Sequence, residues 1–399
     1  FADAHLTAIF GCLVHRGFMK TTTLRASRST VSAVVRGHPW VFRDGLADAQ
    51  AGEVVALRDE RDKTVGWGLA DDGPICVRVL GRGAPPDTTF ERVVAERIRR
   101  SDAVRPALLP PDTNCWRVIN GAGDGLPGLV VDRYAGLAVV RIYSRAWEVH
   151  LATIVDVLSR LPWVESVIRR LGVGSVDGRK GIERLHGPDP GEAVLVQECG
   201  LVLLVRPRVG QKTGLFLDQR EHRALIRRWS AGRRTANLFA YNGGFSVAAA
   251  AGGAARVHTV DIARHAIDDA REIFRLNGID PDAHAFEVGD AFAWRPRGTL
   301  DLLVLDPPSL THGAKSDSAA RSAYRKLHRH HSPSVARDGL LATSSCTARV
   351  SLADWQSYVQ SGLAGDWSWS WTSGGPPDHP TALAHDEARY LKFAVLRRR

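Results

Sequence analysis

The sequence predicts an α/β protein whose C-terminal half contains a parallel sheet. From about residue 198, short apolar runs alternate with helix-length segments, the pattern of parallel strands joined by crossover helices. Two of these runs, 302–305 and 340–342, lead into the polar signatures Asp306-Pro307-Pro308 and Ser344-Ser345-Cys346. Ligands bind open α/β sheets in the crevice beyond the carboxyl ends of the strands. A carboxylate and a thiol are therefore expected side by side at such a crevice.

The composition is that of a globular protein with a basic surplus. The 399 residues exceed one ordinary core and indicate two or three domains. No run of about 18 apolar residues occurs, so no transmembrane helix and no membrane partner are expected. Lys and Arg number 53 against 43 Asp and Glu, which favours a polyanionic partner such as RNA. A proteome rich in Arg would give the same surplus of basic residues. The basic residues of 4–43 are not accompanied by any acidic residue, however, and this local excess favours a polyanionic partner.

The cysteines and the start of the chain bear on the compartment and on processing. The five cysteines are scattered, odd in number and without C-x-x-C spacing, which argues against disulfides and zinc and predicts a cytoplasmic protein. They are Cys12, Cys76, Cys115, Cys199 and Cys346. The only methionine is Met19, so residues 1–18 are interpreted as an upstream or non-native extension.

Residues 19–91 and 92–196 differ in the strands and helices that their sequences predict. The first region contains strand-like runs spaced about ten residues apart, typical of a small β-barrel or sandwich. Its predicted strands are 32–35, 53–57, 64–68 and 75–80. The second region predicts a mixed α/β domain that ends at a Gly/Pro-rich link. Its predicted helices are 92–104 and 147–161, and its predicted strands are 128–134, 138–143 and 166–170.

Residues 197–399 carry the predicted parallel sheet. Its strands are 235–239, 256–260, 283–288, 300–305 and 340–344, and its helices are 219–229, 245–251, 264–277 and 319–336. Near the end, Trp367, Trp369 and Trp371 alternate with polar residues, which predicts a strand with one aromatic face, used for packing rather than base stacking. A closing strand is predicted at 390–396.

The first strand and helix of this sheet predict a cofactor site. Gly243 and Gly244 stand at the bend between them, where backbone N–H groups can approach a ligand. The next strand ends in Asp261, placed to bind ribose hydroxyls, and the third ends in Asp290, placed to accept from the amine of adenine. A P-loop is excluded because no Lys-Ser/Thr follows the glycines, and the lack of G-x-G-x-x-G disfavours NAD. S-adenosylmethionine, with ribose and adenine but no phosphate, fits best.

Asp306-Pro307-Pro308 predicts a rigid turn that aims a carboxylate into the crevice. Paired prolines fix an extended turn and lack N–H groups. Enzymes that methylate exocyclic amines place an aromatic residue next, to stack on the flipped base, whereas Ser309 follows here. The alternative is a purely structural turn.

Cys346 is interpreted as a nucleophile, although most free cysteines are buried and inert. Pyrimidine C5 is too weak a nucleophile to attack a methylsulfonium. A thiolate that adds to C6 makes C5 enamine-like, so that C5 accepts the methyl group, and loss of the C5 proton then expels the thiol. Asp306 can bind the N3/N4 edge of the ring and stabilise the charge that develops there.

Several motifs resemble the bacterial 23S ribosomal RNA large-subunit cytosine-C5 methyltransferase family. The most specific is the eleven-residue segment 210–220, GQKTGLFLDQR. The others are 237–246 (NLFAYNGGFS), 306–308 (DPP), 345–346 (SC), 378–380 (DHP), 124–134 (DGLPGLVVDRY) and 36–42 (RGHPWVF). The resemblance covers nearly the whole chain from Met19. Segments 309–317 and 327–332 depart from the family pattern, so the target nucleotide is not determined.

The resemblance implies a PUA domain at 19–91, a central α/β domain at 92–196 and a Rossmann-like methyltransferase domain at 197–399. It implies 5-methylcytosine as product, with Cys346 and Asp306 as catalytic residues. Further cofactor contacts are implied at Gln219, Arg220, Phe239, Tyr241, Asn242 and Gly243. Contacts to 23S ribosomal RNA are implied at Arg36, His38, Trp40 and Lys212.

Two other functions stay open from the sequence. Uracil-C5 methylation uses the same thiol chemistry and differs only in the groups that face position 4 of the base. A non-catalytic RNA-binding assembly factor is disfavoured by the intact pair of Asp306 and Cys346. No metal is expected, because His328, His330 and His331 lack a second cluster and are interpreted as a solvated basic helix face. The sequence does not determine the oligomeric state, and a homodimer is compatible with it.

Overall fold

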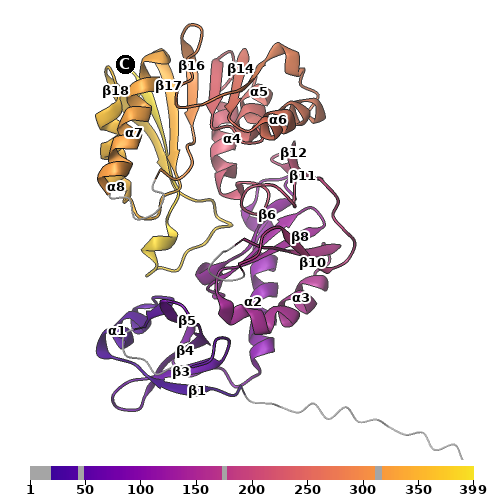
Figure 1. Ribbon diagram of the computed structural model, residues 1–399, viewed down its shortest axis with the longest axis vertical. Coiled ribbons are helices and arrows are strands. Elements are labelled where there is room, and N and C mark those ends of the chain that lie inside the picture. Colours follow the sequence, from indigo (N-terminus) through magenta and orange to yellow (C-terminus); the bar gives the residue numbers. More distant parts are fainter. Residues whose placement is uncertain (1–18, 44–48, 173–177, 311–316) are drawn as a thin grey trace, which may run out of the picture.

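The computed structural model describes residues 19–43, 49–172, 178–310 and 317–399, and in these parts the chain forms four successive sheets (Figure 1). The predicted extension at 1–18 and most of the divergent segment 309–317 lie outside the described residues.

The N-terminal region is a five-stranded sheet with one helix, in the order β1-β3-β4-β5-β2. β1 is parallel to β3, and the other pairs are antiparallel. The elements are β1 (Thr22–Arg25), α1 (Arg28–Arg36), β2 (Trp40–Phe42), β3 (Val54–Arg58), β4 (Thr64–Ala70) and β5 (Ile75–Arg82). Three of the four strands predicted here are confirmed.

The strand predicted at 32–35 is wrong, because these residues belong to α1. Ser27 caps this helix by accepting a hydrogen bond from the backbone N–H of Thr30, and Gly37 ends it in the left-handed conformation with φ of 93°. Val31 and Val34 lie one turn apart and pack into the core of the N-terminal sheet. Capping and helical spacing thus outweigh the strand preference of the β-branched residues.

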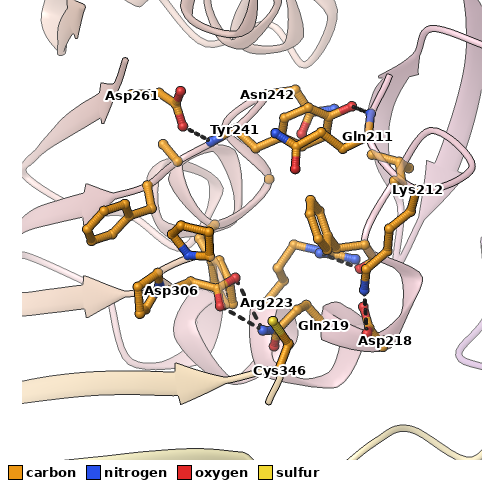
Figure 2. Close-up of a pocket in the computed structure, with 18 of the residues that line it drawn as sticks. Gln211, Lys212, Asp218, Gln219, Arg223, Tyr241, Asn242, Asp261, Asp306 and Cys346 are labelled. Atoms are coloured by element: carbon orange, nitrogen blue, oxygen red, sulfur yellow. Dashed lines mark hydrogen bonds and ion pairs between the residues drawn. The ribbon is translucent and has the colours of Figure 1, made fainter. Parts of the chain in front are cut away.

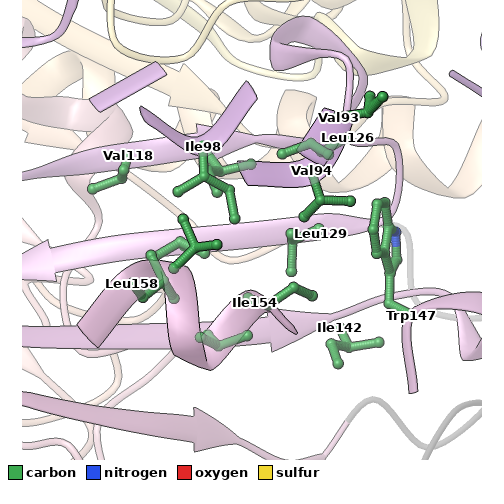
Figure 3. Close-up of a cluster of buried hydrophobic side chains, with 14 of the residues drawn as sticks. Val93, Val94, Ile98, Val118, Leu126, Leu129, Ile142, Trp147, Ile154 and Leu158 are labelled. Atoms are coloured by element: carbon green, nitrogen blue, oxygen red, sulfur yellow. The ribbon is translucent and has the colours of Figure 1, made fainter. Parts of the chain in front are cut away.

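The central region is a five-stranded sheet in the order β10-β9-β8-β7-β6, on which two helices pack (Figure 3). Its elements are α2 (Phe90–Val104), β6 (Cys115–Asn120), β7 (Leu129–Tyr134), β8 (Leu137–Ile142), a 3-10 helix (Arg145–His150), α3 (Leu151–Ser159), β9 (Ser166–Arg170) and β10 (Ile182–His186). The helix predicted at 147–161 is α-helical only in its second part, and β6 and β10 were not predicted. Trp67 and Leu80 of the N-terminal sheet join the same apolar core, so the two regions share buried surface.

The C-terminal region confirms the predicted parallel α/β sheet. After the hairpin β11 (Val194–Glu198) and β12 (Leu201–Val205), seven strands follow in the order β15-β14-β13-β16-β17-β19-β18, and among them only β19 runs antiparallel to the others. The strands are β13 (Arg234–Leu238), β14 (Arg256–Asp261), β15 (Ala285–Val288), β16 (Leu300–Leu305), β17 (Val335–Ser345), β18 (Trp367–Ser373) and β19 (Lys392–Arg398). The helices are α4 (Arg220–Arg228), α5 (Gly244–Ala251), α6 (Arg264–Leu276), α7 (Asp317–His331) and α8 (Leu352–Gly362).

Three predictions in this region need correction. The helix predicted at 319–336 ends at His331, because Pro333 follows and β17 begins at Val335. The tryptophans do not share one face, because a bulge pairs Trp369 with Leu396 and Trp371 with the adjacent Val395.

The third correction concerns the histidines of α7. His328 and His331 are fully buried rather than solvated, and burial lowers the pKa of both. His328 contacts the Tyr324 carbonyl at 2.7 Å and the Thr343 hydroxyl at 3.0 Å. The apolar face of α7 that packs on the sheet therefore includes neutral histidines.

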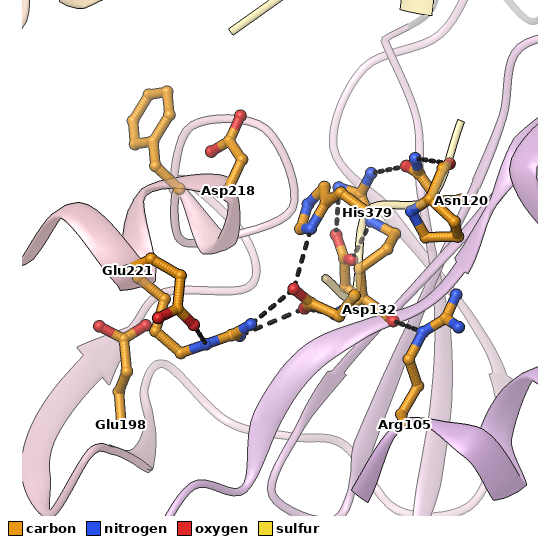
Figure 4. A network of polar contacts seen from close by, with 12 residues as sticks. Arg105, Asn120, Asp132, Glu198, Asp218, Glu221 and His379 are labelled. Carbon is orange, nitrogen blue, oxygen red and sulfur yellow. Dashed lines mark hydrogen bonds and ion pairs between the residues drawn. The ribbon is translucent and has the colours of Figure 1, made fainter. Parts of the chain in front are cut away.

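Buried ions join the central and C-terminal regions (Figure 4). Arg117 donates to Asp132 from Nε at 2.5 Å, and its backbone N–H donates to Asp378 at 3.0 Å. Arg220 also donates to Asp378 at 2.5 Å, and neither of these two side chains is exposed. Thr213 donates to Asp132 at 2.5 Å. Segments far apart in the sequence are thus held by one continuous polar network.

Candidate active site

A cavity lies where the order of the parallel strands reverses. β13 and β16 are neighbours, with Leu238 opposite Leu305, and β14 and β17 lie on their outer sides. The cavity has a volume of about 190 Å³ and opens at the carboxyl ends of these strands (Figure 2). Its polar lining consists of Gln211, Lys212, Asp218, Gln219, Arg223, Tyr241, Asn242, Asp261, Asp306 and Cys346.

The turn after β13 forms one wall of the cavity. Phe239, Tyr241 and Gly243 adopt left-handed φ values of 61°, 49° and 79°, so the backbone folds tightly before α5 begins. Asp261, at the end of β14, accepts the backbone N–H groups of Tyr241 at 2.8 Å and Ala263 at 2.9 Å. These two bonds fix the carboxylate against the turn while it lines the cavity.

The loop of the eleven-residue motif closes over this turn. The Tyr241 hydroxyl accepts from the backbone N–H of Gln211 and donates to the carbonyl of Gly214, both at 3.0 Å. Asn242 donates to the Leu204 carbonyl at 3.1 Å. The motif 210–220 and the turn 239–243 therefore form one wall, although residues 221–238 separate them in the sequence.

Asp306 and Cys346 stand at the opposite wall. The amide nitrogen of Gln219 lies 3.2 Å from both Asp306 oxygens, and Ser344 also donates to this carboxylate. Burial raises the pKa of Asp306 to about 6, against the Ser344 hydrogen bond and helped by the charge of Asp218. Burial also raises the pKa of Cys346, and the ammonium of Lys212 opposes that rise.

Lys212 and Asp218 form a charged pair beside the thiol. Lys212 donates to Asp218 at 2.8 Å, and the hydroxyl of Tyr390 donates to the same oxygen at 2.6 Å. Although Asp218 is buried, the ammonium holds the pKa of its carboxyl well below the usual range. Within this pair the Lys212 ammonium lowers the pKa of Cys346 and favours the thiolate, whereas the Asp218 carboxylate raises it.

Three predicted cofactor residues do not line the cavity. Arg220 faces away and is buried against Asp378, because the helix α4 turns this position toward the central region. The N–H of Gly243 donates to Ala240 within the turn, so this glycine shapes the wall. Asp290 is exposed and accepts from the N–H of Phe292. The prediction of Arg220 as a ligand contact is corrected on this basis.

The predicted RNA contacts lie in different places. Arg36 is exposed and lines a groove between α1 and the turn after β3. The ring of Trp40 packs on His385 of the C-terminal region with centroids 4.3 Å apart, and His38 lies 3.9 Å from Glu387. His38 and Trp40 therefore join two regions of the chain, and Lys212 lies in the cavity.

Sequence reasoning missed Ile262, which lines the cavity although 76% of it is exposed. An apolar side chain held in solvent directly after a strand-end acid is suited to pack on a flat base. The signal was the dipeptide Asp261-Ile262, of which only the acid was interpreted.

Two features are absent from the described ranges. No helix within them is long and apolar enough to cross a membrane. No group of three or more His, Cys, Asp or Glu side chains among the described residues is placed to hold a metal ion.

The sheet and its cavity define a class of α/β enzymes that bind a nucleoside cofactor at the strand ends. A family model for S-adenosylmethionine-dependent methyltransferases matches residues 124–349, and a model for a PUA-like domain matches residues 25–82. The chain therefore belongs to the S-adenosylmethionine-dependent methyltransferase family, and S-adenosylmethionine is its cofactor.

Relatives match along nearly the whole chain. A ribosomal RNA large subunit methyltransferase of Deinococcus radiodurans is 36% identical and covers 94% of this chain and 96% of its own. Ribosomal RNA large subunit methyltransferase I of Klebsiella pneumoniae is 31% identical over 90% of this chain and 94% of its own. A proposed methyltransferase from Streptococcus mutans shares the fold with a TM-score of 0.81, at 23% identity over 94% of this chain and 99% of that chain. The resemblance drawn from the sequence motifs is confirmed.

Replacing Asp261 by alanine is expected to weaken S-adenosylmethionine binding by roughly 1–3 kcal/mol, because an acceptor in the cavity is lost. Titration calorimetry measures the affinity, and thermal unfolding checks that the turn survives. Asp268→Ala is the matched control, since Asp268 is exposed and outside the lining, and it should leave the affinity unchanged. An unchanged affinity in Asp261→Ala would remove this residue from the cofactor site.

Asp306→Asn is expected to become more stable relative to the wild type as the pH rises from 4 to 7. The pKa of Asp306 is raised to about 6, so the folded protein holds this proton more tightly than the unfolded chain does. The stability linked to that proton is present at low pH and is lost as the pH rises through about 6. Denaturant unfolding of both proteins across this pH range tests the sign, and a pH-independent difference contradicts the raised pKa.

Proposed function

We propose that this enzyme methylates C5 of cytosine in 23S ribosomal RNA through a covalent bond between Cys346 and C6. The observation that carries the proposal is that one cavity includes a thiol, a carboxyl group and the cofactor wall that ends at Asp261. Methylation of an exocyclic amine or a purine would leave the thiol without a role.

The residues of the cavity suit S-adenosylmethionine. Asp261 supplies an acceptor for ribose hydroxyls, and the exposed side chain of Ile262 supplies an apolar surface for adenine. We propose that Asp290, at the end of β15, accepts from the adenine amine. When bound, the cofactor supplies an electrophilic methyl group.

The proposed reaction assigns one task to each catalytic residue. The Cys346 thiolate forms a bond to C6, and N3 takes a proton from Asp306, whose raised pKa keeps part of the carboxyl protonated near neutrality. The electron-rich C5 then takes the methyl group, and the Asp306 carboxylate stabilises the cationic ring. A general base then removes the C5 proton, the electron pair of the C5–H bond restores the double bond and expels the Cys346 thiolate from C6, and N3 returns its proton to Asp306.

Three features support ribosomal RNA as the substrate. The chain has a net charge of +10, it contains a PUA-like domain, and its relatives are named as ribosomal RNA large subunit methyltransferases. A basic protein gains affinity for a polyanion by releasing counterions. A cytoplasmic location and a homodimer stay predictions.

The decisive experiment uses 23S ribosomal RNA fragments that carry 5-fluorocytidine. Fluorine cannot leave as the C5 proton does, so the wild type should form a protein–RNA adduct that survives denaturation in the presence of S-adenosylmethionine. Fragments with 5-fluorouridine form the parallel arm. An adduct only with fluorouridine would establish uracil as the base, and methylation without an adduct on either RNA would overturn the covalent mechanism.

A further inference from the structure

The amide of Gln219 lies between the Asp306 carboxylate and a buried histidine. Its nitrogen is 3.2 Å from both oxygens of Asp306, and its oxygen is 2.5 Å from Nδ1 of His222. Nε2 of His222 is 2.9 Å from the hydroxyl of Ser373. Ser373, at the end of β18, is thus connected to the carboxyl group of the cavity by an unbroken chain of hydrogen bonds.

The chemistry of the partners fixes the direction of this chain. An ionised carboxylate only accepts hydrogen bonds, so the nitrogen of the Gln219 amide must face Asp306. The amide oxygen then faces His222, and because it also only accepts, Nδ1 must carry the imidazole proton. Nε2 is consequently the acceptor for the Ser373 hydroxyl. While Asp306 is ionised, one arrangement of protons satisfies all three contacts.

The surroundings hold His222 in this state. His222 and Gln219 are 2% and 3% exposed, and the imidazole stacks on Phe393 with centroids 4.0 Å apart and an interplanar angle of 5°. Burial lowers the pKa of His222 to about 3, and the charge of Arg223 lowers it too, against the charge of Asp218 and a hydrogen bond to the Gly374 backbone, so the ring is neutral and has a single donor. The 2.5 Å contact with the Gln219 oxygen places that donor on Nδ1.

We propose that His222 is a positioning residue, which fixes the Gln219 amide so that its N–H groups face Asp306 and orient the carboxyl group. The role in catalysis rests on the proposed function of Asp306. Without the Nδ1 proton, the amide can rotate and place its oxygen against the carboxylate. Asp306 also faces the charges of Asp218, Lys212 and Arg223, which the change leaves in place. The rotated amide should therefore raise the pKa of Asp306 further and turn the carboxyl group from its position.

The test compares His222→Leu with His222→Asn. Leucine fills the site without a donor, whereas the asparagine amide offers an N–H near the position of Nδ1. Carbon-13 NMR of Asp carboxyl groups, with the Asp306 signal assigned by its loss in Asp306→Asn, measures the pKa directly. We expect a higher Asp306 pKa in His222→Leu and a value near that of the wild type in His222→Asn. Equal pKa values in all three proteins would overturn the inference, whatever the substrate is.

Methylation rates form the second arm of the test. His222→Leu should lower kcat on the order of tenfold to a hundredfold with the S-adenosylmethionine Kd unchanged, as expected for a misplaced catalytic group, and His222→Asn should recover most of it. A wild type that shows no cytosine methylation and no fluorocytidine adduct would refute the proposed function, while the NMR result would still decide the role of His222.

Two further variants guard against a folding defect. Ser373→Ala removes only the outer partner and should shift the Asp306 pKa in the same direction by a smaller amount. In a Gln219→Met background, His222→Leu should have no further effect on the pKa, because the connecting amide is gone. His328→Leu is the matched control, a buried histidine outside this chain of hydrogen bonds, and should leave the Asp306 pKa unchanged. Additive effects of His222→Leu and Gln219→Met would contradict the inference.

Discussion

Cys346→Ala should abolish methyl transfer, with a loss on the order of 10⁴-fold or more, while the S-adenosylmethionine Kd stays at the wild-type value. The loss is large because the thiol supplies the covalent step, for which no other group in the cavity can substitute. Cys346→Ser should be nearly as inactive, since a hydroxyl is a far weaker nucleophile near neutral pH. Transfer of labelled methyl groups to 23S ribosomal RNA measures the rate, and calorimetry measures the affinity.

Cys199→Ala is the matched control for this variant. Cys199 is a free cysteine in the turn between β11 and β12 and does not line the cavity, so its loss should leave the rate unaltered. Methylation by Cys346→Ala at a rate near the wild type would show that C5 is not activated by a thiol. Attention would then move to an exocyclic amine or a purine as the acceptor.

Asp378→Ala should destabilise the folded protein by about 3–5 kcal/mol, because the buried Arg220 loses its buried partner and keeps only the exposed Glu221 at 3.4 Å. Arg220 and Asp378 are both fully buried, and Asp378 also accepts the backbone N–H of Arg117. Denaturant unfolding measures the change. Because Asp378 binds residues of both the central and the C-terminal region, the transition should move as a whole.

Asp366→Ala is the control for Asp378→Ala, because it removes an ion pair at the surface rather than a buried one. Asp366 pairs with Arg399 at 2.9 Å, but both side chains are more than half exposed, so its loss should cost no more than about 1 kcal/mol. Replacing both Arg220 and Asp378 by apolar residues of similar size should recover much of the lost stability, since no unpaired charge stays buried. A cost below 1 kcal/mol for Asp378→Ala would show that water or rearrangement compensates Arg220.

The parallel sheet was predictable because short strand-length runs, the most apolar of them at 302–305, alternate with helix-length segments. The run 302–305 is buried on both faces, and a continuous apolar run of this length predicts a buried strand without knowledge of its neighbours. The proximity of Asp306 and Cys346 was predictable as well, because neighbouring parallel strands such as β16 and β17 end at the same edge of the sheet.

The errors arose where distant partners decide the structure. Arg220 resembles a ligand contact in sequence, but Asp378, 158 residues away, neutralises it inside the protein. The bulge between Trp369 and Trp371 depends on pairing with β19, which no local pattern shows. In α1, the cap at Ser27 was readable from the sequence, and the choice of strand overlooked it.

The contact between Trp40 and His385 links the N-terminal domain to the wall of the cavity. His385 packs on Trp40, while Leu391, only six residues later, lines the cavity beside Cys346. Six residues span at most about 20 Å even when fully extended. We therefore expect that a large rotation of the N-terminal domain either breaks the aromatic contact or moves residues 386–391 and, with them, the wall of the cavity.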